Sequence, residues 1–357
     1  MKIRLHPQSD GIALLIVMCA IFVLSILAAG LAFSMKVESK LAVSTDTNQR
    51  LIWLGRSGAE LACWVLAQEA TLQPYDSLNQ RWAGGPGGLG ETNSALAGID
   101  LSHYQIGDGF VSVKIVDLER FANINTAPTP EITQALTLMG VDAGSISVVS
   151  DSIQDWVQPG DAPRIAGAKT DYYLGLNPPY NCKEAPMDDL SELLLVKGIW
   201  DHPEIYWGGA ATNHPGASFQ HHLGFGNAGE APNYPFGLVD LFTPFSSGKI
   251  NINTADANVL QLIPGVDNNV ADSILKIRAG PDGVAGTEDD TPIPNPEGAL
   301  QGAGDQNPKV GGAACTIRST TFKVTVTAQI GNYKRDFNAI LYRAGRNIQV
   351  VSFYWNY

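Results

Sequence analysis

The N-terminal part of the chain is an unbroken run of apolar residues from Ile12 to Met35. A short leader with the basic residues Lys2 and Arg4 precedes this run, and no charged side chain interrupts it. A helix needs about 20 apolar residues to cross a bilayer, so the run predicts one membrane-spanning helix. Because basic residues tend to stay on the cytoplasmic side, the leader predicts a cytoplasmic N-terminus, with the rest of the chain beyond the membrane.

The helical pattern continues beyond the apolar run. Apolar residues recur at helical spacing as far as Ala70, and Pro74 ends the pattern. The sequence therefore predicts one rod from Ile12 to about Ala70, about 90 Å long at 1.5 Å per residue. Gly55 and Gly58 are expected to weaken its middle by about 1 kcal/mol each relative to alanine. The last third of the rod is predicted to present an apolar stripe to a globular head.

Alternating apolar and polar residues predict four strands separated by a long gap. The first is Phe110–Leu118, without a hairpin partner nearby, and the others are Thr320–Ile330, Arg335–Arg343 and Ile348–Trp355. A lone strand is not stable, so we pair the first strand with the other three in one small antiparallel sheet packed on the long helix. The predicted fold class is therefore α+β, with residues 119–315 as a large, mainly α-helical insertion.

The insertion contains an internal repeat. Asn-Ile-Asn-Thr-Ala occurs at residues 123–127 and again at 251–255, each time followed by a helical pattern, a Gly-Val hairpin and a second helical pattern. Thr126 and Thr254 are predicted helix N-caps. The units look like helix-hairpin-helix motifs, which often bind DNA phosphates through hairpin amides. In the second hairpin Asp267 would repel a phosphate, so we predict a structural or protein-contact role for the repeat.

Charge and motif content exclude several function classes. The net charge is −12, which offers no basic surface for nucleic acid. The sequence contains no Gly-x-Ser-x-Gly elbow, His-Glu-x-x-His motif or phosphate loop, so we predict that the chain is not an enzyme. Cys182 and Cys315 are a candidate disulfide pair in an oxidising compartment, although the sequence leaves their connectivity open.

The N-terminal region resembles the type IV pilin-like proteins. In that class a prepilin peptidase cuts after a glycine and methylates the new N-terminus, which here implies cleavage after Gly11 and a mature chain beginning at Ile12. Most such subunits carry glutamate at the fifth mature position, where this chain has Ile16. In the family this carboxylate, costly inside a bilayer, is thought to pair with the terminal amine of a neighbouring subunit. A subunit at the filament tip has no neighbour above it, so Ile16 favours a cap.

The insertion resembles the K-type minor pseudopilins of type II secretion. The matching features are the two Asn-Ile-Asn-Thr-Ala units, Asp155-Trp156, Asp161, Pro163-Arg164, Gly167-Ala168, Asp171-Tyr172-Tyr173, Pro179-Tyr180, Ser191-Glu192-Leu193 and Val196-Lys197-Gly198. Together with the patterns above, the resemblance divides the chain into a leader (1–11), a transmembrane segment (12–35), a pseudopilin helix and first strand (36–118), the insertion (119–315) and the C-terminal strands (316–357).

The resemblance implies a minor pseudopilin of the bacterial inner membrane that caps the pseudopilus tip and helps to initiate its assembly for export across the outer membrane. Implied partners are the I- and J-type minor pseudopilins, the major pseudopilin, the inner-membrane secretion platform, prepilin peptidase and exported proteins, and nucleic acid is not among them. The alternatives are a K-like subunit of a type IV pilus or DNA-uptake filament, and a simple membrane-tethered periplasmic protein. A secretory signal cleaved after Gly30 is a third interpretation of the apolar run.

An acidic, glycine-rich loop at residues 280–292 is a candidate calcium site. Calcium takes six to eight oxygen ligands in loose geometry, and some K-type pseudopilins carry calcium in the large domain. The candidate ligands are Asp282, Thr287, Glu288, Asp289 and Asp290. Their spacing is not that of an EF-hand, and a solvated acidic turn is the alternative. For a second carboxylate group, Asp155, Asp161 and Asp171, we favour structural hydrogen bonds over a metal.

Overall fold

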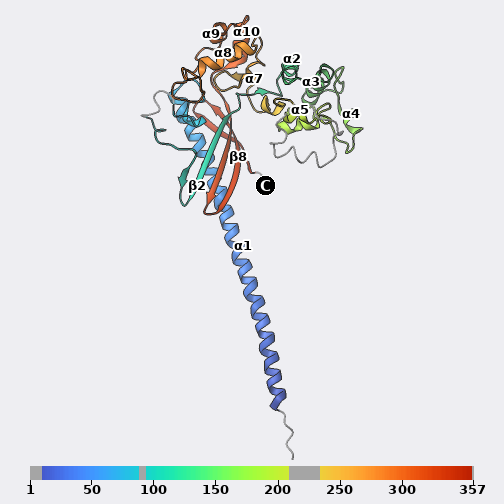
Figure 1. Ribbon diagram of the computed structural model, residues 1–357. Coiled ribbons are helices and arrows are strands. Elements are labelled where there is room, and N and C mark those ends of the chain that lie inside the picture. Colours follow the sequence, from blue (N-terminus) through green and yellow to red (C-terminus); the bar gives the residue numbers. More distant parts are fainter. Residues whose placement is uncertain (1–9, 88–93, 209–233, 356–357) are drawn as a thin grey trace, which may run out of the picture.

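A computed structural model of the chain describes residues 10–87, 94–208 and 234–355. Helix α1 (Asp10–Leu72) is a single rod of 63 residues, which makes it about 95 Å long. Figure 1 shows its N-terminal part standing alone, while a globular head is built around its C-terminal part. The predicted continuous helix from Ile12 to Ala70 is therefore confirmed.

A five-stranded antiparallel sheet lies against the upper half of α1. Its strand order is β1-β2-β7-β8-β9, and the pairing of Val113 with Val326 shows that the first predicted strand joins the C-terminal meander. The strands are β1 (Tyr104–Ile106), β2 (Gly109–Asp117), β7 (Thr321–Ile330), β8 (Tyr333–Ala344) and β9 (Asn347–Trp355). The expectation that the first strand has no hairpin partner nearby was wrong, because β1 pairs with it. With three residues, β1 is too short to show an alternating pattern.

Close packing between α1 and the sheet explains the two glycines in the helix. A Cβ atom on Gly55 would lie 2.4 Å from Cδ2 of Phe337, and one on Gly58 would lie 2.4 Å from Cγ1 of Val326. Phe337 and Val326 are fully buried. The glycines weaken an isolated helix, but here they let the helix backbone approach the sheet.

The insertion leaves the sheet after β2, returns before β7 and forms two lobes. In Figure 1, α2 to α5 gather to one side of the head, and α7 to α10 lie above the end of α1. The helical elements of the insertion are α2 (Thr129–Met139), α3 (Ala143–Val157), α4 (Thr170–Leu174), η3 (Leu190–Leu195), α5 (Glu204–Trp207), η5 (Leu238–Asp240), α7 (Ala257–Leu260), α8 (Asn268–Arg278), α9 (Pro296–Ala303) and α10 (Pro308–Ala314). Outside the insertion, a short helix, η1 (Arg81–Ala83), follows α1. Two short parallel pairs complete the insertion: β3 (Ala122–Asn123) with β4 (Phe242–Thr243), and β5 (Ile250–Asn251) with β6 (Cys315–Thr316).

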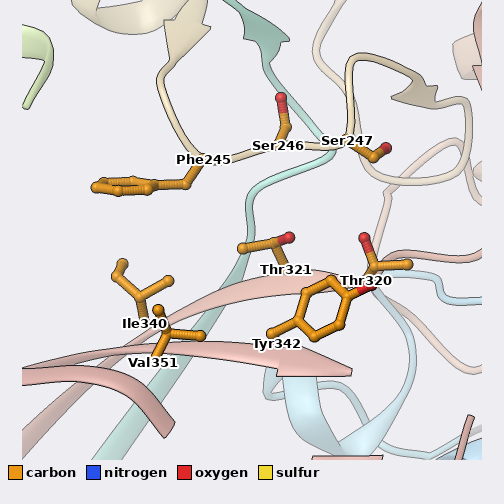
Figure 2. Close-up of a pocket in the computed structure, with 8 residues that line it drawn as sticks. All are labelled: Phe245, Ser246, Ser247, Thr320, Thr321, Ile340, Tyr342 and Val351. Carbon is orange, nitrogen blue, oxygen red and sulfur yellow. The ribbon is translucent and has the colours of Figure 1, made fainter. Parts of the chain in front are cut away.

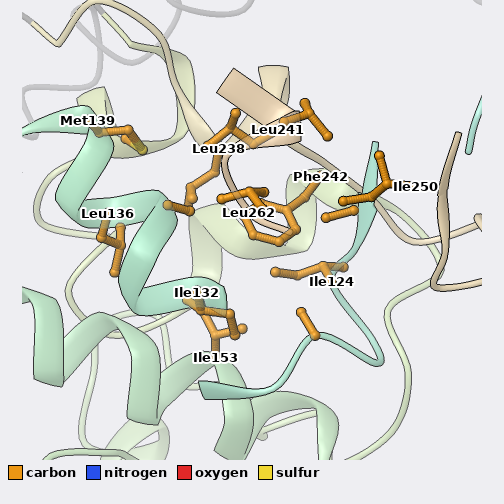
Figure 3. Close-up of a cluster of buried hydrophobic side chains, with 14 of the residues drawn as sticks. Ile124, Ile132, Leu136, Met139, Ile153, Leu238, Leu241, Phe242, Ile250 and Leu262 are labelled. Carbon is orange, nitrogen blue, oxygen red and sulfur yellow. The ribbon is translucent and has the colours of Figure 1, made fainter. Parts of the chain in front are cut away.

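The two lobes share one hydrophobic core, separate from the core between α1 and the sheet. Figure 3 shows Ile132 and Leu136 of α2 packed with Phe242 of β4 and Ile124, and close to Ile250 of β5. Residues from both repeat units thus contribute to a single interior. The fold is α+β, as predicted, with the insertion as one packed body above and beside the pseudopilin-like helix and sheet.

Candidate functional site

The first half of α1 is an apolar surface without a partner in this single chain. The side chains of Ile12, Ile16 and Phe33 are exposed by 66%, 64% and 71%. α1 is long and apolar enough to cross a membrane over its first part. Gly11 lies within the first turns of the helix. The structure does not test cleavage there, so processing at Gly11 stays a prediction.

A buried polar cluster joins the insertion to the sheet. This junction cluster consists of Asp76, Asp117, Glu119, Asn251, Thr254, Ser319 and Arg343. Asp117 is the last residue of β2, and its Oδ2 accepts hydrogen bonds from Ser319 Oγ at 2.7 Å and Thr254 Oγ1 at 2.6 Å. Asn251 Nδ2 donates to the same oxygen at 3.0 Å. The point where the chain leaves the sheet is thereby bonded to the point where it returns and to the second repeat unit.

The cation of the junction cluster comes from β8. Arg343 Nη1 donates to Asp76 Oδ1 at 2.9 Å, and Nη2 donates to Asp76 Oδ2 and to the carbonyl of Ser319. The side chains of Arg343 and Asp76 are only 2% and 3% exposed. Asp76 Oδ2 also accepts from Ser319 N at 2.7 Å. Asn251 of the insertion donates to the carbonyl of Asp76 at 3.2 Å, so the segment after α1, the sheet and the insertion meet at this buried pair.

Two further carboxylates lie in the junction cluster beside that pair. Glu119 accepts from Thr320 Oγ1 at 2.6 Å and from Thr321 N at 3.0 Å. Burial, together with the charge of Glu119, raises the pKa of Asp117 to about 7. Buried charges are costly unless they are paired and hydrogen-bonded, so this dense bonding stabilises an otherwise unfavourable arrangement. The cluster is suited to holding a fixed geometry.

A cavity of about 440 Å³ opens beside the junction cluster. Figure 2 shows Phe245 on one side of it, facing Ile340, Tyr342 and Val351 on the outer face of the sheet. The lining is completed by hydroxyl groups, from Ser246, Ser247, Thr320 and Thr321. These residues supply apolar contacts and hydroxyls, and no carboxylate, imidazole or amine.

The two Asn-Ile-Asn-Thr-Ala units have the same hydrogen-bond pattern. In the first, Asn125 accepts from Met187 N at 2.7 Å and donates to Met187 O at 3.1 Å. In the second, Asn253 accepts from Ile293 N at 2.8 Å and donates to Ile293 O at 3.1 Å. Each unit thus uses its second asparagine to clamp the backbone of a distant segment, which explains why the motif occurs twice.

The threonines of the repeat do not cap helices, contrary to the sequence prediction. The N-caps are Pro128 for α2 and Asp256 for α7, and neither makes a side-chain capping bond. Thr254 instead donates to Asp117 in the junction cluster. The helices begin later than predicted because the asparagine-bonded turn extends past the threonine: Ala127 N and Ala255 N bond back to Asn123 O and Asn251 O.

The hairpins present acids where a DNA phosphate would bind. Asp267 caps α8 by accepting from Val270 N at 2.9 Å, and Asp142 caps α3 by accepting from Gly144 N and Ser145 N at 3.0 Å each. A helix N-terminus binds anions through these same amides. Because the aspartates already occupy them, the hairpins are unsuited to phosphate, in line with the structural role predicted for the repeat.

The carboxylates of the candidate calcium loop bind the loop's own backbone. Asp289 accepts from Asp282 N at 3.0 Å and from Thr287 Oγ1 at 2.8 Å, and Asp290 accepts from Gly286 N at 2.7 Å. Among the residues that the structure describes, no group of three or more His, Cys, Asp or Glu side chains is placed to hold a metal ion. This arrangement does not test calcium binding by Glu288 and its neighbours, which stays a prediction.

The candidate disulfide residues lie in different parts of the insertion and are free thiols in the structure. Cys182 is buried close to α3, where its sulfur lies 3.6 Å from the carbonyl of Asp155. Cys315 begins β6 and pairs with Ile250. Burial raises the pKa of the Cys315 thiol to about 12, so this group has little thiolate character.

Of the three carboxylates for which structural hydrogen bonds were predicted, Asp155 makes them. Asp155 is 3% exposed, and its Oδ2 accepts from Arg164 N at 3.0 Å. Asp161 and Asp171 lie on the surface. Asp155 therefore fixes the loop between α3 and α4, whereas Asp161 and Asp171 are exposed.

A family model described as "Type II secretion system (T2SS), protein K" matches residues 115–205. The type II secretion system protein K of Klebsiella pneumoniae is 24% identical over 210 residues, which cover 55% of this chain and 60% of that protein. The Pseudomonas aeruginosa protein of the same name is 25% identical over 209 residues, which cover 53% of this chain and 57% of that protein. The resemblance to the K-type minor pseudopilins is confirmed.

The matched segment contains most of the features that carry the resemblance, although the second Asn-Ile-Asn-Thr-Ala unit, at 251–255, lies outside it. Residues 115–205 run from the end of β2 through the first repeat unit to α5, and they include Asp117 and Glu119 of the junction cluster. The match to the Klebsiella and Pseudomonas proteins spans about 60% of the length of these K-type relatives.

The fold has a solved counterpart. A chain of the crystal structure of the GspK-GspI-GspJ complex from the enterotoxigenic Escherichia coli type 2 secretion system superposes with a TM-score of 0.61. The superposition covers 88% of this chain and 98% of that chain at 16% identity. At this identity the likeness concerns the fold, which is that of the K-type relatives.

Proposed function

We propose that the chain is a minor pseudopilin that caps the tip of a type II secretion pseudopilus and helps to initiate its assembly. The observation that carries the proposal is the pairing of an exposed apolar shaft with a large insertion at its opposite end. The shaft from Ile12 to Met35 is uncharged, and Figure 1 shows α7 to α10 above the other end of α1. The shaft can enter a bundle of similar helices, while the insertion covers the top.

The shaft explains how such a subunit is held. In lipid, helices associate through close packing, and small residues such as Gly30 let neighbouring helices approach. A carboxylate in the membrane is costly unless it is paired. Ile16 avoids this cost in a subunit that has no neighbour above it. The chain then anchors in the inner membrane by a single pass, with its N-terminus cytoplasmic and its head in the periplasm.

The partners follow from the same proposal. The solved relative was crystallised in a complex with GspI and GspJ, and we propose the corresponding I- and J-type minor pseudopilins as partners of this chain. The major pseudopilin, the inner-membrane secretion platform, prepilin peptidase and exported proteins are the other partners that we propose. Assembly is the role of the shaft, and the mechanism requires no chemistry from the head.

The first test is the mass of the N-terminal peptide of protein extracted from membranes. A peptide that begins at methylated Ile12 supports prepilin-type processing, whereas one beginning at Met1 or just after Gly30 contradicts it. The second test is export in a host strain that lacks the chain. Loss of exported proteins from the medium, restored by the wild-type chain, supports the secretion role, and unchanged export contradicts it.

A further inference from the structure

Ile165 lies between α3 and α4 and is the most exposed large apolar side chain among the described residues, with a relative exposure of 106%. A single exposed aliphatic side chain is ordinary on a protein surface. The loop that carries Ile165 is different, because charged side chains hold its backbone on both sides of the isoleucine.

Two carboxylates of α3 bind the backbone on either side of Ile165. Asp155 Oδ2 accepts from Arg164 N at 3.0 Å, and Asp151 Oδ2 accepts from Ala166 N at 3.1 Å. Asp155 is 3% exposed, so the protein has buried a carboxylate in order to fix this loop. Hydrogen bonds to charged groups are stronger than those between neutral groups. The backbone at Ile165 is thereby held in one conformation.

A lysine from beyond η3 holds the other side of the loop. Lys197 Nζ donates to the carbonyls of Ala166 and Gly167 at 3.2 Å each. Gly167 has no room for a side chain, because a Cβ atom there would lie 2.0 Å from Asp155 Oδ2. A partner that binds Ile165 therefore does not have to order the loop, which removes one of the main costs of association.

The elements next to the loop, α4 and η3, carry further exposed apolar side chains. Tyr172 and Leu174 of α4 and Leu195 of η3 are 37%, 51% and 37% exposed. Lys197 Nζ, which binds the loop, lies 5.1 Å from the centre of the Tyr172 ring. We call Ile165 and Tyr172, which Lys197 connects, the Ile165 patch. Figure 1 shows α4 at the outer end of its lobe, on the side away from α1.

The segment that carries the patch is acidic. Residues 151–201 contain nine acidic and four basic side chains. Asp161, Asp171 and Asp201 form no ion pair with any residue that the structure describes. Two of the four basic side chains are already hydrogen-bonded within the chain, since Lys169 and Lys197 each donate to two backbone carbonyls. Anionic lipid and a second copy of this patch are both disfavoured by like-charge repulsion.

We propose that the Ile165 patch docks into an apolar pocket, rimmed by lysine and arginine, on another protein. The pre-ordered isoleucine enters the pocket, and carboxylates of the acidic segment, such as Asp171, meet the basic residues around it. The inference takes one premise from the proposed function, namely that another protein meets the outer side of the filament tip.

Export is the first readout, with variants Ile165→Asp, Ile165→Leu and Val310→Asp expressed in a strain that lacks the chain. Val310 on α10 is a matched control because it is also exposed, at 57%. Since both sites lie on the surface, unfolding temperatures should stay unchanged. Export by Ile165→Asp should fall about tenfold relative to the wild type, with Ile165→Leu and Val310→Asp close to the wild type. Full export by Ile165→Asp overturns the proposal.

Photocrosslinking of the full-length chain in membranes is the second readout, with a photoreactive amino acid at position 165 or 310. Position 165 should label peptides of another protein that combine apolar residues with nearby lysine or arginine. The yield should fall several-fold between about 50 mM and 500 mM salt, because screening weakens charge pairing. Equal labelling from position 310, or labelling only of lipid or of a second copy, overturns the proposal. If the wild-type chain does not restore export, the secretion role fails, and crosslinking still decides the inference.

Discussion

Arg343 of β8 and Asp76, which follows α1, form an ion pair that is almost completely buried at the base of the insertion. The two residues are 267 positions apart in the chain. Removal of one partner of a buried pair leaves an uncompensated charge, which is more damaging than replacement of both. This relationship leads to a prediction about the stability of the head.

Arg343→Met should lower the free energy of unfolding by about 3–5 kcal/mol, because Asp76 and the carbonyl of Ser319 lose their donor. Urea denaturation of the detergent-solubilised chain measures the change. The control is Arg50→Met, which breaks the exposed pair with Asp108 and should have little effect. An equal decrease in the free energy of unfolding of the two variants would show that the buried pair contributes no more to stability than the exposed pair.

Asp117 makes stability depend on pH. Its folded-state pKa is raised to about 7, against a usual value of about 4. Between about pH 4 and pH 7 the folded chain retains a proton that the unfolded chain has lost, so this contribution to stability falls as the pH rises. The slope is at most about 1.4 kcal/mol per pH unit.

Asp117→Asn removes this titration while it keeps the shape of the side chain. The free energy of unfolding of the variant should therefore vary less between pH 4 and pH 7 than that of the wild type, in urea titrations at each pH. Asp188→Asn, at an exposed carboxylate, serves as the control. Identical pH profiles for the wild type and Asp117→Asn would contradict the raised pKa.

Gly58→Ala should destabilise the head by about 1–3 kcal/mol, although alanine favours helices. The reason is steric, since the new Cβ would lie 2.4 Å from Val326. Gly30→Ala on the same helix is the control, because a Cβ there meets nothing within 4 Å. Thermal unfolding followed by circular dichroism compares the two variants, and a stabilised Gly58→Ala variant would mean that α1 lies further from the sheet.

Asn125→Ala and Asn253→Ala should each lower the free energy of unfolding by about 1–3 kcal/mol, because each leaves a backbone amide and carbonyl of a distant segment unpaired. Asn268→Ala, at an exposed residue that bonds only its neighbour Asp272, should be close to neutral. Urea denaturation provides the values. Unequal losses at Asn125 and Asn253 would show that the two repeat units are not energetically equivalent.

Periodic patterns predicted the elements that are long and amphipathic. The helix α1, the strands β2 and β7 to β9 and the repeat all follow from local spacing of apolar residues. The missed strand β1 has three residues, too few for a period, and the threonine caps failed because the asparagines form the turns first. A periodic pattern needs a long element, whereas β1 has only a few residues. The threonine caps depend on competition between side chains, which a periodic pattern does not show.

Contacts between distant residues could not be predicted from the sequence. No local pattern brings Arg343 to Asp76, or Asn251 of the insertion to Asp117. Nor could the sequence show that Asp282 accepts a hydrogen bond from the loop amide of Val284. Ile165 likewise gave no signal, because the sequence does not reveal whether an isoleucine in a loop is buried or exposed.

The pairing of β2 with β7 has a consequence for the order of folding. About 200 residues separate the two strands, from Asp117 to Thr321, although they lie side by side. While the chain is being synthesised, α1 and β2 have no sheet to pack on until the last strands emerge. The insertion, whose contacts are more local, has its whole sequence available earlier and can fold first. The sheet and α1 therefore come together last, beside an insertion that has already folded.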